Sequence, residues 1–129
     1  MMFGAALGLS SVLIGAFASH GLKHLLSVKS LGWMTTAVSY QMYHALAILA
    51  VGVLMMKVGK NSLLLTSGYS FSLGVLLFSG SLYVLALIEM GVIPSLIKGY
   101  VVFMIPAGGV ALIIGWLSLF LAASKLTES

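Results

Sequence analysis

The chain has 129 residues, of which 61% are hydrophobic and 6% are charged, whereas soluble domains carry about 25% charged residues. A chain of this size has too small a core to hide so much apolar surface from water, so lipid is the expected solvent. The net charge of +4 comes from scattered lysines without a basic patch, which argues against nucleic-acid binding, and the absence of cysteine excludes disulfides and thiolate metal sites.

The first apolar segment, at about residues 3–22, is predicted to cross the membrane. Its small residues recur every three or four positions along one helical face, which favours close packing against another helix. These residues are Gly4, Gly8, Ser11, Gly15 and Ser19. A cleaved signal peptide is the alternative, because Ala16-Phe17-Ala18 resembles a cleavage site. No Lys or Arg precedes the apolar run, so we favour a membrane span.

The segment from Lys23 to Trp33 mixes lysines with leucines, and we expect it to form a short amphipathic helix at the membrane surface. His20 and His24 lie at its start with helical i to i+4 spacing, so they form a candidate interfacial pair. Two imidazoles without a nearby Cys, Asp or Glu make a weak metal site, and we therefore predict no bound metal or other cofactor.

The second predicted span covers about residues 34–56 and contains a polar stretch, Tyr40-Gln41-Met42-Tyr43-His44. An imidazole and an amide in hydrocarbon need hydrogen-bond partners, which the other helices must supply. We therefore expect Tyr40, Gln41 and His44 to belong to a buried polar network. His44 is either a structural side chain or a ligand or proton carrier, and we favour the structural interpretation.

The third predicted span, at about residues 63–88, is rich in hydroxyl groups. Ser79 and Tyr83 lie on one of its faces, and a rise of about 1.5 Å per residue places them at the same depth as His44. They complete the predicted network of Tyr40, Gln41, His44, Ser79 and Tyr83.

The fourth span is predicted at about residues 100–124. Pro106-Ala107-Gly108-Gly109 would free backbone groups within it. Either the helix starts near Tyr100 and is broken at this point, or the preceding connection lies in the interface and the helix starts near Pro106.

Four stretches of the sequence resemble a family of small integral membrane proteins that includes YgdD-like and YwdK-like bacterial proteins and the eukaryotic transmembrane protein 256. The stretches are Gly15–Lys23, Tyr40–Ala47, Leu77–Tyr83 and Pro106–Trp116. Ala18-Ser19 and Ile105 depart from the family pattern. The resemblance implies four spans with both termini in the cytoplasm, and it implies no activity.

We therefore expect residues 1–129 to form one all-α transmembrane domain, a four-helix bundle with both termini on the same side, in the bacterial inner membrane. Catalysis is not expected, because the chain has no Asp and a Ser79–His44 pair would lack a carboxylate to orient it. The preferred function is non-catalytic packing against lipid, another copy of the chain or another membrane protein. The alternative is a carrier or binding protein for a proton, a metal or a hydrophobic ligand, with its polar site at His44.

Overall fold

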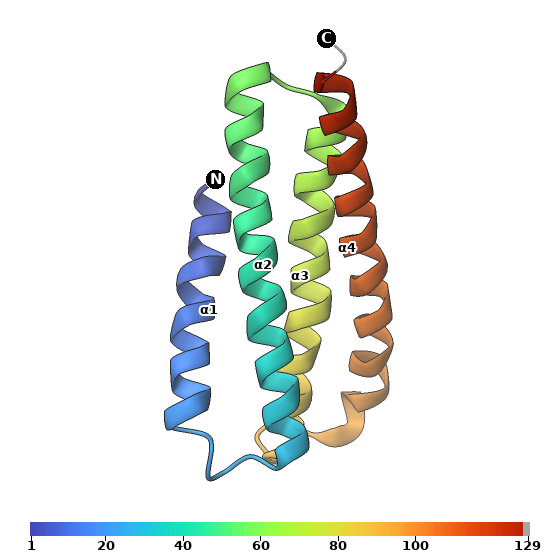
Figure 1. Ribbon diagram of the computed structural model, residues 1–129. Coiled ribbons are helices and arrows are strands. Elements are labelled where there is room, and N and C mark those ends of the chain that lie inside the picture. Colours follow the sequence, from blue (N-terminus) through green and yellow to red (C-terminus); the bar gives the residue numbers. More distant parts are fainter. Residues whose placement is uncertain (128–129) are drawn as a thin grey trace.

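Four long helices make up the computed structural model, which describes residues 1–127 (Figure 1). They are α1 (Met2–His20), α2 (Val28–Val58), α3 (Ser62–Glu89) and α4 (Lys98–Thr127), with a one-turn helix η1 (Ser95–Ile97) before α4. The described residues contain no strand, and all four helices are long and apolar enough to cross a membrane. The prediction of an all-α protein with four membrane spans is confirmed. Successive helices run in opposite directions, so both termini lie toward the same end of the bundle (Figure 1).

The helices differ in length, and this difference shapes the bundle. α2, α3 and α4 have 31, 28 and 30 residues. At about 1.5 Å per residue they exceed the roughly 30 Å hydrocarbon core of a bilayer and reach the headgroups on both sides. α1 has only 19 residues and stops short of the end that α2 reaches (Figure 1). The last turns of α2 therefore have no neighbour on the α1 side.

The boundaries of α2 and α4 differ from the expected ones. α2 already begins at Val28, where the Ser27 hydroxyl caps the helix by accepting a hydrogen bond from the N–H of Ser30. The separate surface helix expected over Lys23–Trp33 is therefore wrong, because residues 21–27 form turns and α2 takes the rest. α4 begins at Lys98, close to the first alternative of a start near Tyr100, and continues through Pro106. The break considered with that alternative is wrong, and so is the second alternative of a start near Pro106. One missing backbone donor, at a proline exposed on the outside of the bundle, does not interrupt the turns on either side.

Small residues hold α1 close to α2. A Cβ atom on Gly4 would lie 3.0 Å from the backbone oxygen of Ala45. Further along the same face, the buried Ser11 hydroxyl donates a hydrogen bond to the backbone oxygen of Val38 at 2.9 Å. The small-residue face predicted from the sequence is thus the face on which α1 packs.

α3 and α4 form an equally close contact. A Cβ atom on Gly108 would lie 2.5 Å from the backbone nitrogen of Phe78, and one on Gly115 would lie 2.5 Å from the ring of Phe71. Phe71 is completely buried and belongs to the main apolar core. Gly108 therefore allows the backbones of α3 and α4 to approach closely, and Gly115 leaves room for the Phe71 ring inside the bundle.

Candidate functional site

Gln41 connects three helices near the middle of the bundle. Its Nε2 donates hydrogen bonds to the backbone oxygen of Leu7 at 2.9 Å and to the hydroxyl of Ser10 at 2.8 Å, both on α1. Its Oε1 accepts a hydrogen bond from the hydroxyl of Tyr83 on α3 at 2.8 Å. The side chain is only 4% exposed. The whole amide is therefore engaged with protein, as a buried amide in hydrocarbon requires.

His44 lies one turn further along α2 and faces α4. Its Nδ1 lies 2.7 Å from the backbone oxygen of Tyr40, and its Nε2 lies 3.1 Å from the indole nitrogen of Trp116. An indole N–H can only donate, so Nε2 accepts and the proton of the neutral ring is on Nδ1. Both ring nitrogens thus have partners within the protein, and a proton on Nε2 would require Trp116 to move away.

Ser79 lies at the level of Ala37, which precedes His44 on α2 by about 10 Å, so the depth expected for Ser79 is wrong. Its buried hydroxyl donates to the backbone oxygen of Ala37 on α2 at 2.9 Å. Tyr40 was expected in the buried network, but its side chain is 39% exposed and its hydroxyl makes no hydrogen bond among residues 1–127. The other predicted residues form three separate links between helices rather than one connected chain. Gln41 binds α1 and α3, His44 binds α4, and Ser79 joins α3 to α2. We call this set the polar network, and it consists of Ser11, Gln41, His44, Ser79, Tyr83 and Trp116.

Three aromatic rings, those of Tyr40, Phe71 and Trp116, have their centroids within 6.0 Å of the His44 ring. The ring of Tyr40 stacks on Phe78 with centroids 4.6 Å apart. Phe71 and Trp116 meet edge to face at 5.1 Å, and the imidazole lies 5.4 Å from Phe71 and 6.0 Å from Trp116. Edge-to-face and offset contacts of this kind stabilise aromatic clusters beyond the area they bury. They fix the plane of the imidazole and leave its Nε2 facing the indole.

A cleft of about 530 Å³ opens between α2 and α4 beside this cluster. α2 lines it with Tyr40, Tyr43 and His44, α3 with Phe78, and α4 with Gly109, Leu112, Ile113 and Trp116. None of these described lining residues is charged. The volume is within the range of small-molecule sites, about 300–1,000 Å³, and the composition, mostly apolar with a few polar groups, is typical of them.

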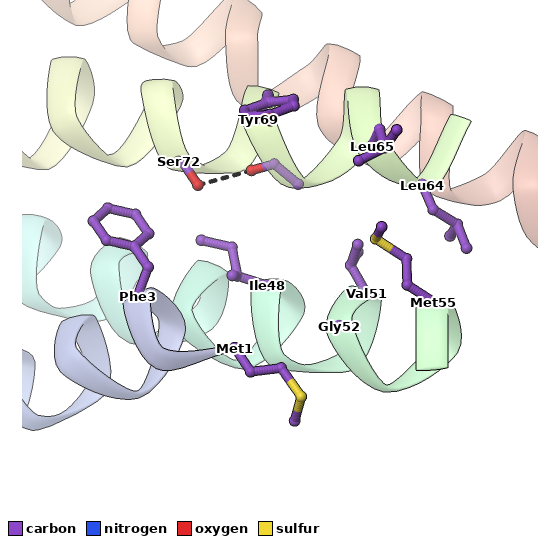
Figure 2. Close-up of a pocket in the computed structure, with 11 residues that line it drawn as sticks. Met1, Phe3, Ile48, Val51, Gly52, Met55, Leu64, Leu65, Tyr69 and Ser72 are labelled. Atoms are coloured by element: carbon purple, nitrogen blue, oxygen red, sulfur yellow. Dashed lines mark hydrogen bonds between the residues drawn. The ribbon is translucent and has the colours of Figure 1, made fainter. Parts of the chain in front are cut away.

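A second cavity, of about 210 Å³, lies where α1 ends short of α2 (Figure 2). Met1 and Phe3 form one side, Ile48, Val51 and Met55 come from α2, and α3 supplies the remainder of the lining. The Ser72 hydroxyl at its edge donates to the backbone oxygen of Gly68 in its own helix at 2.8 Å (Figure 2). This cavity therefore offers apolar contacts and little that would select a polar ligand.

The candidate pair His20 and His24 is not positioned by a common helix. α1 ends at His20, and His24 lies in the turn that follows, so the i to i+4 helical spacing does not apply. Both side chains are exposed. No group of three His, Cys, Asp or Glu side chains suited to a metal ion occurs among the described residues. The polar contact at this end of the bundle is instead made by Glu89, whose carboxylate accepts a hydrogen bond from the hydroxyl of Ser30 at 2.7 Å.

The sequence places this fold in a known family. Residues 14–109 match the family described as protein of unknown function DUF423. The chain belongs to this family. The match spans the last third of α1, all of α2 and α3, and the first turns of α4, and so covers most of the polar network.

Relatives of this DUF423 chain are named as membrane proteins. A UPF0382 membrane protein of Haemophilus influenzae is 42% identical over 92% of this chain and 87% of its own length. YwdK of Bacillus subtilis, also named a UPF0382 membrane protein, is 36% identical over 97% of this chain and 95% of its own length. The Escherichia coli relative YgdD, named an inner membrane protein, is 35% identical over 98% of this chain and 89% of its own length. No solved structure shows significant similarity to the chain. The DUF423 chain is thus a small multi-pass membrane protein of unknown function, as the sequence resemblance implied.

Sequence reasoning missed Trp116 and assigned Ser11 only to packing. Trp116 is not part of the predicted network, yet its N–H is the hydrogen-bond partner of His44. The position of Trp116 in the sequence could have indicated this role, because the residue lies well inside the predicted span 100–124. An indole at that depth cannot reach the headgroups, so its N–H needs a partner within the protein. No comparable signal identifies which carbonyl the Ser11 hydroxyl would meet.

Proposed function

We propose that this DUF423 chain is a non-catalytic integral membrane protein that acts by contact with lipid or with a partner in the bilayer. In this proposal the polar network is structural. One observation carries the proposal: the hydrogen-bonding groups of Gln41 and His44 all have partners in the same chain. Catalysis would require a positioned acid, base or nucleophile that is free to act on a substrate.

The replacement His44→Leu tests this role. It removes the interhelical bond to Trp116 and leaves the indole N–H unpaired in an apolar environment. Interhelical hydrogen bonds in membrane proteins contribute about 0.6 kcal/mol on average and up to about 1.7. We expect a loss of unfolding free energy in this range, measured by titrating the purified protein with SDS in mixed micelles. Thr35→Val is the matched control, since the Thr35 hydroxyl bonds only to its own helix at Leu31. A His44→Leu protein as stable as this control would argue against a structural role.

A second candidate function is binding of a hydrophobic ligand, and the cleft beside His44 favours it. The proton-carrier version of this candidate receives less support, because both imidazole nitrogens are engaged with protein. The metal version would need more donor groups than the described residues bring together. We therefore retain the hydrophobic ligand as the alternative.

We further propose that the chain lies in a bacterial inner membrane with both termini in the cytoplasm. The name of the Escherichia coli relative supports the membrane. Lysines are evenly divided between the two ends of the bundle, so the orientation rests on the resemblance to the family. The chain has no cysteine, so a single introduced thiol can be labelled without background. In intact cells, an impermeant maleimide should label Val92→Cys, between α3 and α4, and should spare Lys60→Cys, between α2 and α3. Labelling with the opposite pattern would reverse the orientation.

A further inference from the structure

Two tyrosine hydroxyls on the outer side of α2, about halfway along the helix, have no partner among the described residues. Tyr40 is 39% exposed and Tyr43 is 60% exposed, and both side chains line the cleft between α2 and α4. Within residues 1–127 neither hydroxyl makes a hydrogen bond, in contrast to the neighbouring Gln41 and His44. A hydroxyl without a partner is expensive in hydrocarbon, because no water is present to replace the bond.

The depth of these hydroxyls excludes the usual explanation for exposed tyrosine in membrane proteins. Tyrosine is commonly found at the membrane surface, where its hydroxyl meets headgroups and water. Tyr43 is instead near the midpoint of α2, which runs from Val28 to Val58, and so lies about 20 Å from either end of the helix. The hydroxyls therefore need an acceptor that is itself located near the bilayer midplane.

The lining of the cleft restricts what that acceptor can be. The absence of charged groups among its described lining residues favours an uncharged molecule. The rings of Tyr40, Phe78 and Trp116 offer flat apolar surfaces for stacking. A phospholipid does not fit, because its acyl chains carry no acceptor and its headgroup remains at the membrane surface. A neutral, planar ring with carbonyl oxygens and an apolar tail satisfies all three conditions.

We propose that the α2–α4 cleft is a binding site for a lipid-soluble quinone, with Tyr40 and Tyr43 donating hydrogen bonds to its carbonyl oxygens. This inference specifies the ligand of the second candidate function and rests on that candidate. It concerns binding alone and involves no electron transfer. The polar network keeps its structural role, because the hydrogen bonds of Gln41 and His44 remain intact when the cleft is filled.

The protein contains a suitable reporter for this site. Of its two tryptophans, Trp116 lines the cleft and Trp33 lies near the start of α2. In a Trp33→Phe background, the fluorescence therefore comes from the cleft alone. The purified protein in detergent is titrated with decylubiquinone, whose ring quenches tryptophan fluorescence. We expect saturable quenching, and quenching that only rises linearly with probe concentration would overturn the proposal.

Two sets of variants separate specific binding from partition into the micelle. Gly109 lines the cleft, and a Cβ atom there would meet nothing within 4 Å. Gly109→Leu should therefore fill the cleft without disturbing the helix packing and abolish the saturable phase. Gly99→Leu is the matched control, because Gly99 is also on α4, also has open space and lies outside the cleft. Equal quenching of the two variants would contradict the proposed site.

The hydroxyls are tested by Tyr40→Phe/Tyr43→Phe, which keeps both rings. The double variant loses two hydrogen bonds, so the Kd for decylubiquinone should rise about fivefold to 150-fold. Decylbenzene, which has an alkyl tail but no carbonyl group, should fail to compete. An unchanged Kd or effective competition by decylbenzene would refute the hydrogen-bonded mode.

If the cleft is instead covered by a second copy of the chain, the protein will be dimeric, Gly109→Leu will dissociate it and no saturable quenching will occur. The stability of His44→Leu is a separate measurement, so either proposal can fail without the other.

Discussion

Replacing Gln41 with methionine should destabilise the bundle more than any other single polar change in it. Methionine is unbranched and close to glutamine in size, so the packing is retained while the amide is lost. The change removes hydrogen bonds to Leu7, Ser10 and Tyr83, which join α2 to α1 and to α3. With an average of about 0.6 kcal/mol for each interhelical bond, the expected loss is about 2 kcal/mol.

The loss is measured by SDS titration in mixed micelles, with the helical circular dichroism signal as the readout. Ser72→Ala is the control, because the Ser72 hydroxyl bonds only to Gly68 in its own helix. Tyr83→Phe removes one partner of Gln41, so the double variant should lose about 0.5 kcal/mol less than the sum of the two single variants. A Gln41→Met protein no less stable than Ser72→Ala, or strict additivity with Tyr83→Phe, would refute the idea that this amide joins the helices.

Two further predictions use the same titration. Trp116→Phe keeps an aromatic ring against Phe71 but leaves Nε2 of His44 without a donor, so it should lose about 0.6–1.7 kcal/mol; wild-type stability would show that this bond contributes nothing. Gly108→Ala should lose about 1–3 kcal/mol, because its methyl group would overlap the backbone of α3. Gly80→Ala, where the added carbon meets nothing within 4 Å, should be neutral or gain up to about 1 kcal/mol in helix propensity; a similar loss at both glycines would contradict the packing argument.

The fold was predictable from sequence to the extent that local chemistry determines it. Composition alone required lipid as the solvent, and the apolar runs set the number of spans. The small residues of α1 predicted its packing face because Gly4 and Ser11 keep helical phase. The ends of the helices were less predictable. α2 begins early because Ser27 caps it and the helix extends beyond the hydrocarbon, and α4 passes through Pro106 because an outward-facing proline removes only one hydrogen bond.

The candidate site shows a similar division between local and long-range information. A polar residue inside an apolar run indicates that its side chain needs a hydrogen-bond partner. Gln41 and His44 could therefore be identified as members of a buried network. It does not say which partner, because that depends on the relative register of helices that are distant in sequence. Ser79 was expected at the depth of His44, but it binds the backbone of Ala37, about 10 Å away along α2. The cleft depends on how far α2 and α4 diverge, and no local pattern in the sequence encodes that separation.

The contrast between Gln41 and Tyr43 indicates where on the molecule a function should be sought. The two residues are two positions apart on α2, so their side chains point about 200° apart around the helix. Gln41 is buried and fully hydrogen-bonded between α1 and α3, whereas Tyr43 is 60% exposed and has no bond. A bundle stabilised by its interior amide gains nothing in stability from a phenol hydroxyl placed in hydrocarbon. The free energy that this hydroxyl costs the isolated chain becomes available as binding free energy once an acceptor arrives. We therefore expect ligand binding at the lipid-facing cleft of α2 and α4, and we expect the interior polar network to maintain the shape of this cleft.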